Sequence, residues 1–313
     1  MSSVSFHNPL VLGVNGQDGS YLAEALRARG HAVTGAGRQE SARWPREGVR
    51  YVQCDIANPD AVLGLLRTTA PDIVFHVAAI HGAAGFSYEA VWRQAHAVNT
   101  ISVHGILDYI RRENPSCGLV FASSAKVFGP DMPRRIDEDS PRRSTCIYTI
   151  TKNAARELID YYRIRHKVAA SVLYLFNHES PRRLPEFFIP RLASALATAR
   201  AGSGPTPIHA LDFSSDWGDA REYMEIAIDV AERGLGKDFI LATGKTWTGR
   251  ELAAELFARH KLDYRTHITE TNPASGAPPV WRADIARLTA HIGRAPARSV
   301  LDVCEDILRA GAQ

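Results

Sequence analysis

Apolar runs and amphipathic helical patterns alternate along the first half of the chain. Short runs of consecutive apolar residues predict buried strands, and apolar residues spaced three or four positions apart predict helices. Strands that alternate with helices indicate a parallel sheet covered on both faces. The predicted fold class is therefore α/β, with a doubly wound parallel sheet. The predicted strands cover residues 9–14, 31–36, 49–56, 71–79, 118–124 and 169–176, and the predicted helices cover 20–30, 58–70, 88–112 and 144–166.

The second half of the chain has a less regular pattern. Pro- and Gly-bearing connections, the clearest at 201–207 and 271–279, separate its helical patterns. We expect a nucleotide-binding domain over residues 1–176 and a smaller, mostly helical lobe over 177–313, with some later segments returning to the first domain. The lobe is predicted to have helices at 187–200, 219–233, 249–260 and 299–309, and strands near 208–211 and 239–242.

Composition adds few constraints. Of 313 residues, 45% are hydrophobic and 23% are charged, which is ordinary for a globular protein. A net charge of +3 is too small for a nucleic-acid-coating protein, but it is compatible with a phosphate-bearing ligand. No run approaches the roughly 18–20 apolar residues that span a bilayer, and the N-terminal sequence does not resemble a signal peptide. We therefore expect a cytoplasmic protein without a membrane or nucleic-acid partner.

The four cysteines show no metal-binding spacing. Because no two of them form a C-x-x-C pair, we expect neither a zinc site nor a disulfide framework, and no metal cofactor. They are predicted to be buried thiols: Cys54, Cys117, Cys146 and Cys304.

A glycine-rich turn follows the first predicted strand. The sequence GVNGQDG places Gly13, Gly16 and Gly19 between that strand and the next helix. Glycine lets a pyrophosphate approach the backbone, and a helix N-terminus offers free N–H groups to it. The sequence therefore predicts a Rossmann-type dinucleotide site, although a tight turn without a ligand would have the same pattern.

The residues after the second and third strands bear on which dinucleotide binds. A carboxylate at the end of the second strand would favour NAD, but Arg38 stands just after that strand and can pair with a 2′-phosphate. NADP(H) is therefore the predicted cofactor, with Glu40 nearby as an opposing observation. Asp55, at the end of the third strand, suits a contact with the adenine amino group.

Tyr148 and Lys152 form a candidate proton-transfer pair. They lie four positions apart on a predicted helix, so they share a face. An ammonium group close to a tyrosine favours its phenolate, and we expect the pair to act as acid and base. Ser124, at the end of the fifth strand, can hydrogen-bond the same substrate oxygen. The alternative is a surface lysine one turn from a packed tyrosine.

Several segments resemble the extended short-chain dehydrogenase/reductases that act on nucleotide sugars, and most of all the GDP-mannose 4,6-dehydratases. GVNGQDGSYLAE (13–24) is close to that family's cofactor turn, and LFNHESPRR (175–183) is nearly a signature of it. LDFSSDWGDAREYMEIA (211–227) resembles its nucleotide-sugar lobe, and TKNAARE follows Tyr148 as in the family. The resemblance covers roughly residues 10–309.

The resemblance implies a role for each matching position. The phosphates of the cofactor would contact Gly13, Gly16, Gln17, Asp18 and Gly19, and its 2′-phosphate would meet Arg38. Other cofactor contacts would be Asp55, Ile56, Val77, Ala78, Ala79, Tyr148, Lys152, His178 and Arg183. Substrate contacts would be Asn177, Arg191 and Arg221, and the catalytic set would be Ser124, Tyr148, Lys152 and Lys126. Relatives often pair through the two long helices, which implies a homodimer or a dimer of dimers.

The chain departs from the family after the fifth strand. The family has Ser-Thr-Ser-Glu-Leu-Tyr-Gly where this chain has SSAKVFG, so Lys126 replaces the catalytic glutamate and Phe128 replaces a tyrosine. The family's paired arginines after the second strand become Arg38 and Gln39, and residues 80–96 also diverge. A protonated lysine cannot accept the proton that dehydration removes beside the ketone.

The sequence therefore predicts an NADPH-dependent oxidoreductase acting at C4 of a GDP-linked sugar. Reduction of a 4-keto-6-deoxy sugar, such as GDP-4-keto-6-deoxymannose, needs only Ser124, Tyr148 and Lys152. Three alternatives stay open. A dehydratase would use a carboxylate from Asp137, Glu138 or Asp139, an epimerase would use a deprotonated Lys126 as base, and a non-catalytic protein would bind the cofactor alone.

Overall fold

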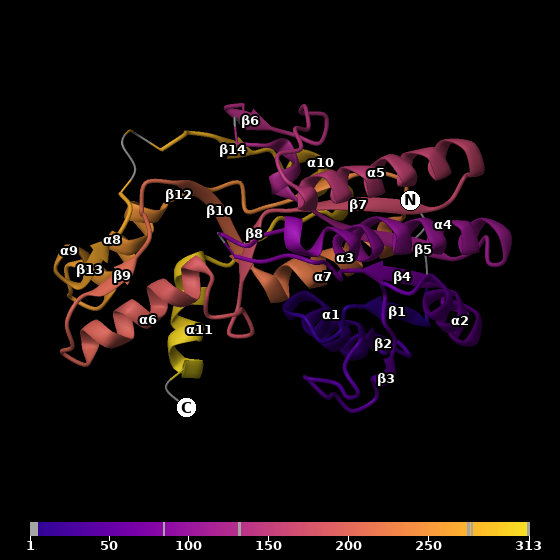
Figure 1. Ribbon diagram of the computed structural model, residues 1–313, viewed down its shortest axis with the longest axis horizontal. Helices are drawn as coiled ribbons and strands as arrows, with labels where there is room; N and C mark the ends of the chain where they lie inside the picture. The colour runs from indigo at the N-terminus through magenta and orange to yellow at the C-terminus, as the bar shows by residue number, and fades with distance from the viewer. Residues whose placement is uncertain (1–5, 84, 131–132, 274–275, 277, 312–313) are drawn as a thin grey trace.

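A seven-stranded parallel sheet forms the centre of the molecule (Figure 1). The computed structural model describes residues 6–83, 85–130, 133–273, 276 and 278–311. The strand order is β11-β7-β5-β4-β1-β2-β3, so the chain winds outward in both directions from β1 and β4. The strands are β1 (Pro9–Leu12), β2 (Thr34–Gly37), β3 (Arg50–Gln53), β4 (Ile73–His76), β5 (Gly118–Ser124), β7 (Ala170–Leu175) and β11 (Phe239–Leu241). This architecture confirms the predicted doubly wound α/β class.

Helices cover both faces of this sheet. Successive residues of β1 point to opposite faces: Leu10 and Leu12 belong to one hydrophobic core and Val11 to the other. All three side chains are fully buried, which is why the strand reads as a continuous apolar run. One face carries α2 (Pro59–Thr69), α4 (Ser102–Arg112) and α5 (Ile147–His166), and the other carries α1 (Gln17–Ala28), α7 (Ala220–Arg233) and α10 (Ala286–Ile292).

A smaller lobe lies beyond the carboxyl edge of the sheet (Figure 1). Its core contains Trp217 and Phe257, and it is separate from the two cores of the sheet. A three-stranded sheet, β12-β10-β8, lies between the lobe and the large domain. The elements are β8 (Asn177–Glu179), α6 (Phe188–Arg200), β9 (Thr206–Ile208), β10 (Ser214–Asp219), β12 (Thr246–Thr248), α8 (Gly249–Arg259), α9 (Tyr264–His267), β13 (Ile268–Glu270) and α11 (Val300–Gly311). A short pair, β6 (Arg135–Ile136) and β14 (Arg282–Ala283), flanks the large domain.

The structure corrects some predicted boundaries in the second half. The strand expected near 239–242 is β11, which extends the main sheet beside β7 instead of belonging to the lobe. The strand expected near 208–211 is β9, three residues that pair with β13. Local periodicity predicted both strands but could not identify their partners, because strand pairing is a long-range property. The later segments that return to the large domain are α7, β11 and α10.

The helix predicted over 88–112 is not one regular helix. It consists of a 3₁₀ turn (Glu89–Val91), α3 (Trp92–His96), a π-helical segment (Ala97–Ile101) and α4. A π segment places one extra residue in a turn, and such segments are frequent at functional sites. Its buried Asn99 faces the loop that follows β4, where the Asn99 side chain accepts a hydrogen bond from Ile80 N at 3.0 Å.

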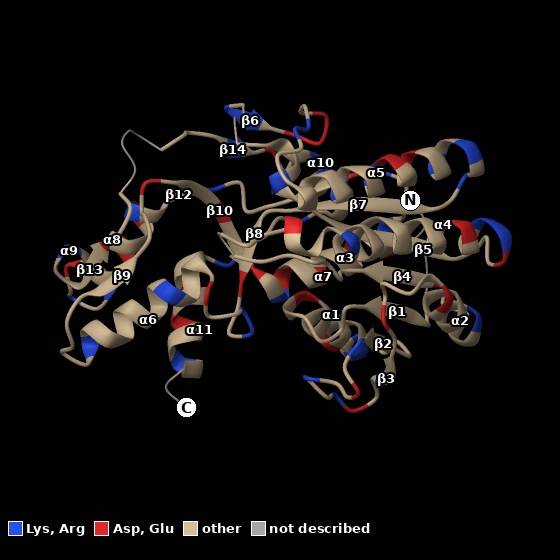
Figure 2. Cartoon of the chain, viewed as in Figure 1, with Lys and Arg blue, Asp and Glu red and all other residues tan. Residues whose placement is uncertain are grey.

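Charged residues of both signs are distributed over the surface, as is ordinary for a globular protein (Figure 2). In the view of Figure 2, basic and acidic residues are interspersed over both parts of the molecule.

All four cysteines are free thiols, and three are buried, whereas Cys146 is half-buried. No helix within the described ranges is long and apolar enough to cross a membrane. The same residues contain no group of three or more potential metal ligands.

Candidate active site

A cavity of about 420 Å³ opens at the carboxyl ends of the central strands, where parallel α/β sheets bind their ligands. It brings together most of the predicted cofactor residues: Gly13, Gly16, Gln17, Asp18, Gly19, Arg38, Asp55, Ile56, Val77, Ala78, Ala79 and Arg183. The sequence reasoning missed others that line it, among them Asn15, Arg43, Trp44, His81, Arg182 and Phe187. Asn15 and Arg182 lie inside the two motifs already singled out, whereas the others lie in segments without a motif and are identified only by the folded chain.

The glycine turn has the shape that a pyrophosphate requires. Gly13 has a φ of +97°, and a Cβ atom there would lie 2.8 Å from the backbone of Ala78. A Cβ on Gly19 would lie 2.2 Å from the Gly13 carbonyl oxygen. Helix α1 begins directly after Gly16, which supplies no side-chain cap, so first-turn N–H groups stay available for a phosphate. These residues fit a dinucleotide.

The LFNHESPRR segment docks onto the start of α1. The His178 Nε2 atom lies 2.9 Å from an oxygen of Asp18, and the Ser180 hydroxyl donates to Gln17 Oε1 at 2.8 Å. Burial alone would lower the pKa of His178, but the charge and hydrogen bond of Asp18 outweigh it and raise that pKa. Burial raises the pKa of Asp18, but the charge and hydrogen bond of His178 outweigh this effect and the pKa of Asp18 falls to about 2. His178 therefore supports the phosphate turn from outside the cavity.

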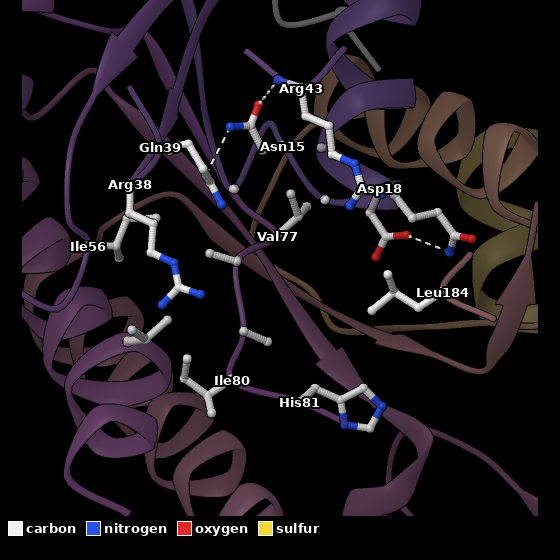
Figure 3. Close-up of a pocket in the computed structure, with 18 of the residues that line it drawn as sticks. Asn15, Asp18, Arg38, Gln39, Arg43, Ile56, Val77, Ile80, His81 and Leu184 are labelled. Carbon is white, nitrogen blue, oxygen red and sulfur yellow. Dashed lines mark hydrogen bonds between the residues drawn. The ribbon is translucent and has the colours of Figure 1, made fainter. Parts of the chain in front are cut away.

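Exposed arginines from the loop after β2, Arg38 and Arg43, also line the cavity. Arg38 lines the cavity and makes no ion pair among the described residues. The Asn15 side chain donates to Gln39 Oε1 at 2.9 Å and accepts from Arg43 N at 2.8 Å, and this fixes the loop after β2 (Figure 3). Asp55 lies at the end of β3 on the same cavity. Arg38 is free to pair with an added phosphate.

Ser124, Tyr148 and Lys152 lie together at the end of β5. The Ser124 hydroxyl hydrogen-bonds the Tyr148 side chain, and Tyr148 is only 5% exposed. Burial raises the pKa of Tyr148, and the hydrogen bond from Ser124 offsets only part of this effect. Burial therefore dominates the pKa of Tyr148, and the expected effect of Lys152 on the phenolate stays a prediction. At neutral pH the tyrosine keeps its proton and can donate it.

Lys152 is buried beneath this tyrosine. Its ammonium donates to the Ala122 carbonyl oxygen at 2.7 Å and lies 4.5 Å from the centre of the Phe121 ring. Burial lowers the pKa of Lys152 to about 7, and the charge of Asp18 opposes this shift. The lysine can therefore change its protonation near neutral pH, as a group that relays protons to Tyr148 must.

Lys126 lies in the 3₁₀ turn (Ala125–Phe128) that follows β5. Its backbone N–H donates to the Ser124 hydroxyl at 3.2 Å, so it lies directly beside the serine predicted to be catalytic. Its side chain is exposed to solvent. Surrounding protein atoms nevertheless remove part of the water around the ammonium, which lowers the pKa of Lys126, and the positive charge of Arg183 lowers it further. Half-buried Cys146 opposes it. We call the region at the end of β5 that holds Ser124, Tyr148 and Lys152 the reacting end. Lys126, in the place of the family's glutamate, is thus a basic group at the reacting end.

The three carboxylates considered as substitutes for that glutamate are held elsewhere. Glu138 is buried and accepts from Ile240 N at 2.9 Å. Asp139 pairs with Arg287, and Asp137 accepts from the Ser140 hydroxyl at 2.8 Å. The structure therefore gives no support to a dehydratase that uses one of them.

The predicted substrate residues lie outside the cavity. The Asn177 amide donates to the Ser215 hydroxyl at 2.7 Å, and the exposed Arg191 donates to the Pro207 carbonyl oxygen at 3.3 Å. Arg221 is held in an ion-pair network by Asp219 and Asp306. Their roles in substrate binding stay predictions.

His81 is the main residue at the reacting end that the sequence did not indicate. Its ring lies 4.7 Å from that of Tyr148, and its Nδ1 atom lies 2.8 Å from the Tyr88 hydroxyl. Burial, Lys126 and Arg183 lower the pKa of His81 to about 3. The imidazole is therefore neutral. A histidine in a divergent loop has no spacing relation to Tyr148, so no local signal could have found it.

The doubly wound sheet, the glycine turn and the serine–tyrosine–lysine set define an enzyme of the extended short-chain dehydrogenase/reductase class. A family model described as GDP-mannose 4,6 dehydratase matches residues 10–281. The chain belongs to this family, which confirms the resemblance seen in its sequence.

Named relatives agree with this membership. A GDP-mannose 4,6-dehydratase of Sordaria araneosa is 28% identical over 268 residues, which are 82% of this chain and 49% of that protein. The chain thus spans about half the length of that relative. GDP-mannose 4,6 dehydratase 2 of Caenorhabditis elegans is 27% identical over 80% of this chain and 69% of its own length.

Solved structures show the same fold. The UDP-glucose 4-epimerase of Thermotoga maritima has a TM-score of 0.82 at 18% identity and covers 97% of this chain and 98% of its own. The dTDP-glucose 4,6-dehydratase of Bacillus anthracis, solved with NAD, has a TM-score of 0.81 at 15% identity and covers 98% and 96%.

Proposed function

We propose that this protein is an NADP(H)-dependent oxidoreductase that transfers one hydride at C4 of a GDP-linked sugar, in the direction that reduces a 4-keto sugar. The observation that carries the proposal is the contrast at the end of β5. Ser124, Tyr148 and Lys152 are together there, while the glutamate position holds Lys126.

The residues present are those that such a reduction needs. The nicotinamide supplies the hydride when the cofactor is bound. Tyr148, which burial keeps protonated, donates its proton to the C4 oxygen, and Ser124 hydrogen-bonds the same oxygen. Lys152, with its pKa near neutrality, returns a proton to the tyrosine. The reaction needs no carboxylate at position 126.

Arg38 supports the choice of NADP(H). A guanidinium without an ion pair in the described chain, lining the cavity just after β2, suits a 2′-phosphate. Replacing it, as Arg38→Ala, should weaken NADPH binding by about 10–100-fold, because a charged hydrogen bond contributes about 1.5–3 kcal/mol. NADH binding should not change. Fluorescence titration of both cofactors measures this, and equal loss for both would contradict the assignment.

The function is tested with purified protein and two substrates. With NADPH and a GDP-linked 4-keto-6-deoxy sugar, we expect oxidation of NADPH at 340 nm and a C4 alcohol identified by NMR. With GDP-mannose and NADP⁺, we expect no 4-keto-6-deoxy product. Formation of that product would overturn the reductase assignment, and binding of NADPH without turnover of either substrate would indicate a non-catalytic protein.

Dehydration of GDP-mannose is the second candidate, because the family and its relatives carry that name. It shares the hydride-transfer residues but also requires a base beside the ketone. The same two-substrate assay separates the candidates.

We also propose that the chain forms a homodimer or a dimer of dimers through α3–α4 and α5. Large apolar side chains are exposed on these helices, including Trp92, Ile101, Ile150 and Ile164, the last 69% exposed. Analytical ultracentrifugation measures the mass of the particle in solution and so tests the oligomeric state. Ile164→Glu should shift the protein toward the monomer, and an unchanged mass would contradict the interface.

A further inference from the structure

The loop that carries His81 is fixed to the catalytic helix. The chain runs from β4 through Val77 to His81 along the cavity (Figure 3). The backbone N–H of Ile80 donates to Asn99 Oδ1 at 3.0 Å, and the amide of Asn99 donates to the Thr151 hydroxyl at 3.0 Å. Thr151 immediately precedes Lys152 on α5. The buried Asn99 therefore couples the position of His81 to that of the hydride-transfer residues.

The imidazole of His81 faces the place where the sugar must bind. Its ring packs on the Tyr148 ring at 4.7 Å with an angle of 33° between planes, and Phe187 lies on another side at 6.0 Å. Nδ1 is hydrogen-bonded to the Tyr88 hydroxyl, while Nε2 has no partner among the described residues. His81 lines the cavity, and in Figure 3 it lies apart from Arg38. A sugar with its C4 oxygen at Tyr148 therefore has its neighbouring carbons close to this imidazole.

The charges around His81 keep it a neutral base. The charged groups with the largest effect on it are cationic: Lys126 after β5, Lys152 on α5, and His178 and Arg183 at β8 and the loop after it. Tyr88 and Tyr148 face it as neutral hydroxyl-bearing rings. The phosphates of a nucleotide sugar and a cofactor would counter these positive charges and make the imidazole a stronger base. Lys126 and Lys152 are other candidate bases in the described part of this end, and each must lose a proton before it can accept one.

We propose that His81 is a catalytic acid–base residue that removes and returns a proton at a carbon next to the C4 ketone of the bound nucleotide sugar. This second activity rests on the proposed function, because the ketone must sit at Tyr148. The imidazole takes the proton, and the C–H electron pair forms an enolate whose oxygen accepts hydrogen bonds from Tyr148 and Ser124. Return of a proton from the imidazole to the same face restores the ketone, and a deuteron taken up from D₂O by the imidazole is incorporated in this way. No oxidant or reductant is consumed.

Solvent exchange measures this step apart from hydride transfer. The protein is incubated in D₂O with NADP⁺ and a GDP-linked 4-keto-6-deoxy sugar, so that the ketone cannot be reduced, and deuterium at C3 or C5 is followed by NMR against a protein-free blank. We expect exchange with the wild type. In His81→Asn, which keeps a donor for Tyr88, exchange should fall about 10²-fold or more. Reduction of the same ketone by NADPH should fall much less than exchange in that variant, because Tyr148 still supplies the proton for reduction.

Matched variants show whether the loss of exchange is specific to His81. His260→Asn changes a half-buried histidine that also has a polar partner, Glu305 at 2.9 Å, but lies outside the cavity, and it should exchange like the wild type. His81→Gln serves as a second variant, and NADPH titration with a thermal melt confirms that each variant is folded. Lys126→Met should keep exchange.

The outcomes separate the two proposals. Absence of exchange in the wild type, normal exchange in His81→Asn, or loss of exchange only in Lys126→Met overturns the role of His81. Equal loss of exchange and reduction in both folded His81 variants also overturns it, because the residue then only positions Tyr148. Exchange without any NADPH oxidation overturns the proposed reductase but leaves the base assignment standing.

Discussion

The phosphate end of the cavity and the neighbouring reacting end, whose Tyr148 and Lys152 do not line the cavity, are built in different ways. At the phosphate end, backbone shape and fixed hydrogen bonds dominate: Gly13 and Gly19 have no room for a side chain, and His178 holds Asp18. At the reacting end, buried ionisable groups dominate, and the pKa values of Tyr148, Lys152 and His81 are all shifted by burial. The first end matches the family closely, while the second carries Lys126 in place of the family's carboxylate.

This difference indicates that cofactor binding and the reaction catalysed can vary independently. A cofactor turn tolerates little change, because any added atom meets backbone. The reacting end keeps its fold when a side chain changes charge, since Lys126 reaches solvent. The reaction can therefore change while cofactor binding is retained, and single substitutions at each end should have separable effects.

The largest effect is expected from removal of the tyrosine hydroxyl. Tyr148→Phe should lower kcat for ketone reduction by about 10²–10⁴-fold, because the proton donor is lost. NADPH affinity, measured by fluorescence titration, should remain unchanged. Tyr161→Phe, on the exposed face of the same helix, is the control and should react as the wild type does. Substantial remaining activity in Tyr148→Phe would mean that another group protonates the C4 oxygen.

Restoring the family's carboxylate should change the reaction itself. Lys126→Glu places a general acid–base group next to Ser124, and with GDP-mannose and NADP⁺ it should form 4-keto-6-deoxy product at least about 10²-fold faster than the wild type. Lys126→Met removes the charge without adding a base and should not gain this product. A variant that binds GDP-mannose but gains no activity would show that residues beyond position 126 set the reaction.

At the phosphate end, a single methyl group should abolish cofactor binding. In Gly19→Ala the new Cβ would lie 2.2 Å from the Gly13 carbonyl oxygen. We expect loss of detectable NADPH binding and a decrease of about 1–3 kcal/mol in the free energy of unfolding, measured by titration and urea denaturation. Gly64→Ala in α2 has open space around its Cβ and should be neutral or slightly stabilising. Normal NADPH binding by Gly19→Ala would contradict the assigned phosphate turn.

The smallest effect concerns the pH dependence of the Asp18–His178 pair. The pKa of Asp18 is lowered from 3.8 to about 2, so its contribution to stability is present above pH 3.8 and disappears as the pH falls toward 2. The pKa of His178 is raised above 6.5, so its contribution is complete below pH 6.5 and is lost as the pH rises through the folded-state value.

Asp18→Asn should therefore destabilise the protein most between about pH 4 and 6.5, by about 1.5–3 kcal/mol, and less at pH 8. Urea denaturation at several pH values measures this difference, and NMR titration of His178 in the variant should give a lower pKa. A destabilisation that does not vary with pH would show that the pair is not charged in the native state.

The sequence by itself determined most strands of the large domain, the glycine turn and the loss of the carboxylate at position 126. These features are local: strand periodicity, glycine spacing and the identity of one residue can be read within a short window. Strand β5 matches its predicted bounds, and α5 begins only three residues after its predicted start.

Only the tertiary structure decided which distant segments meet. It placed β11 beside β7, docked the His178 segment on α1, and brought His81 onto Tyr148 from a loop 67 residues earlier in the chain. It also buried Tyr148, and this burial raises the pKa of the tyrosine hydroxyl. Burial and contact depend on the packing of the whole chain, so no local pattern contains them.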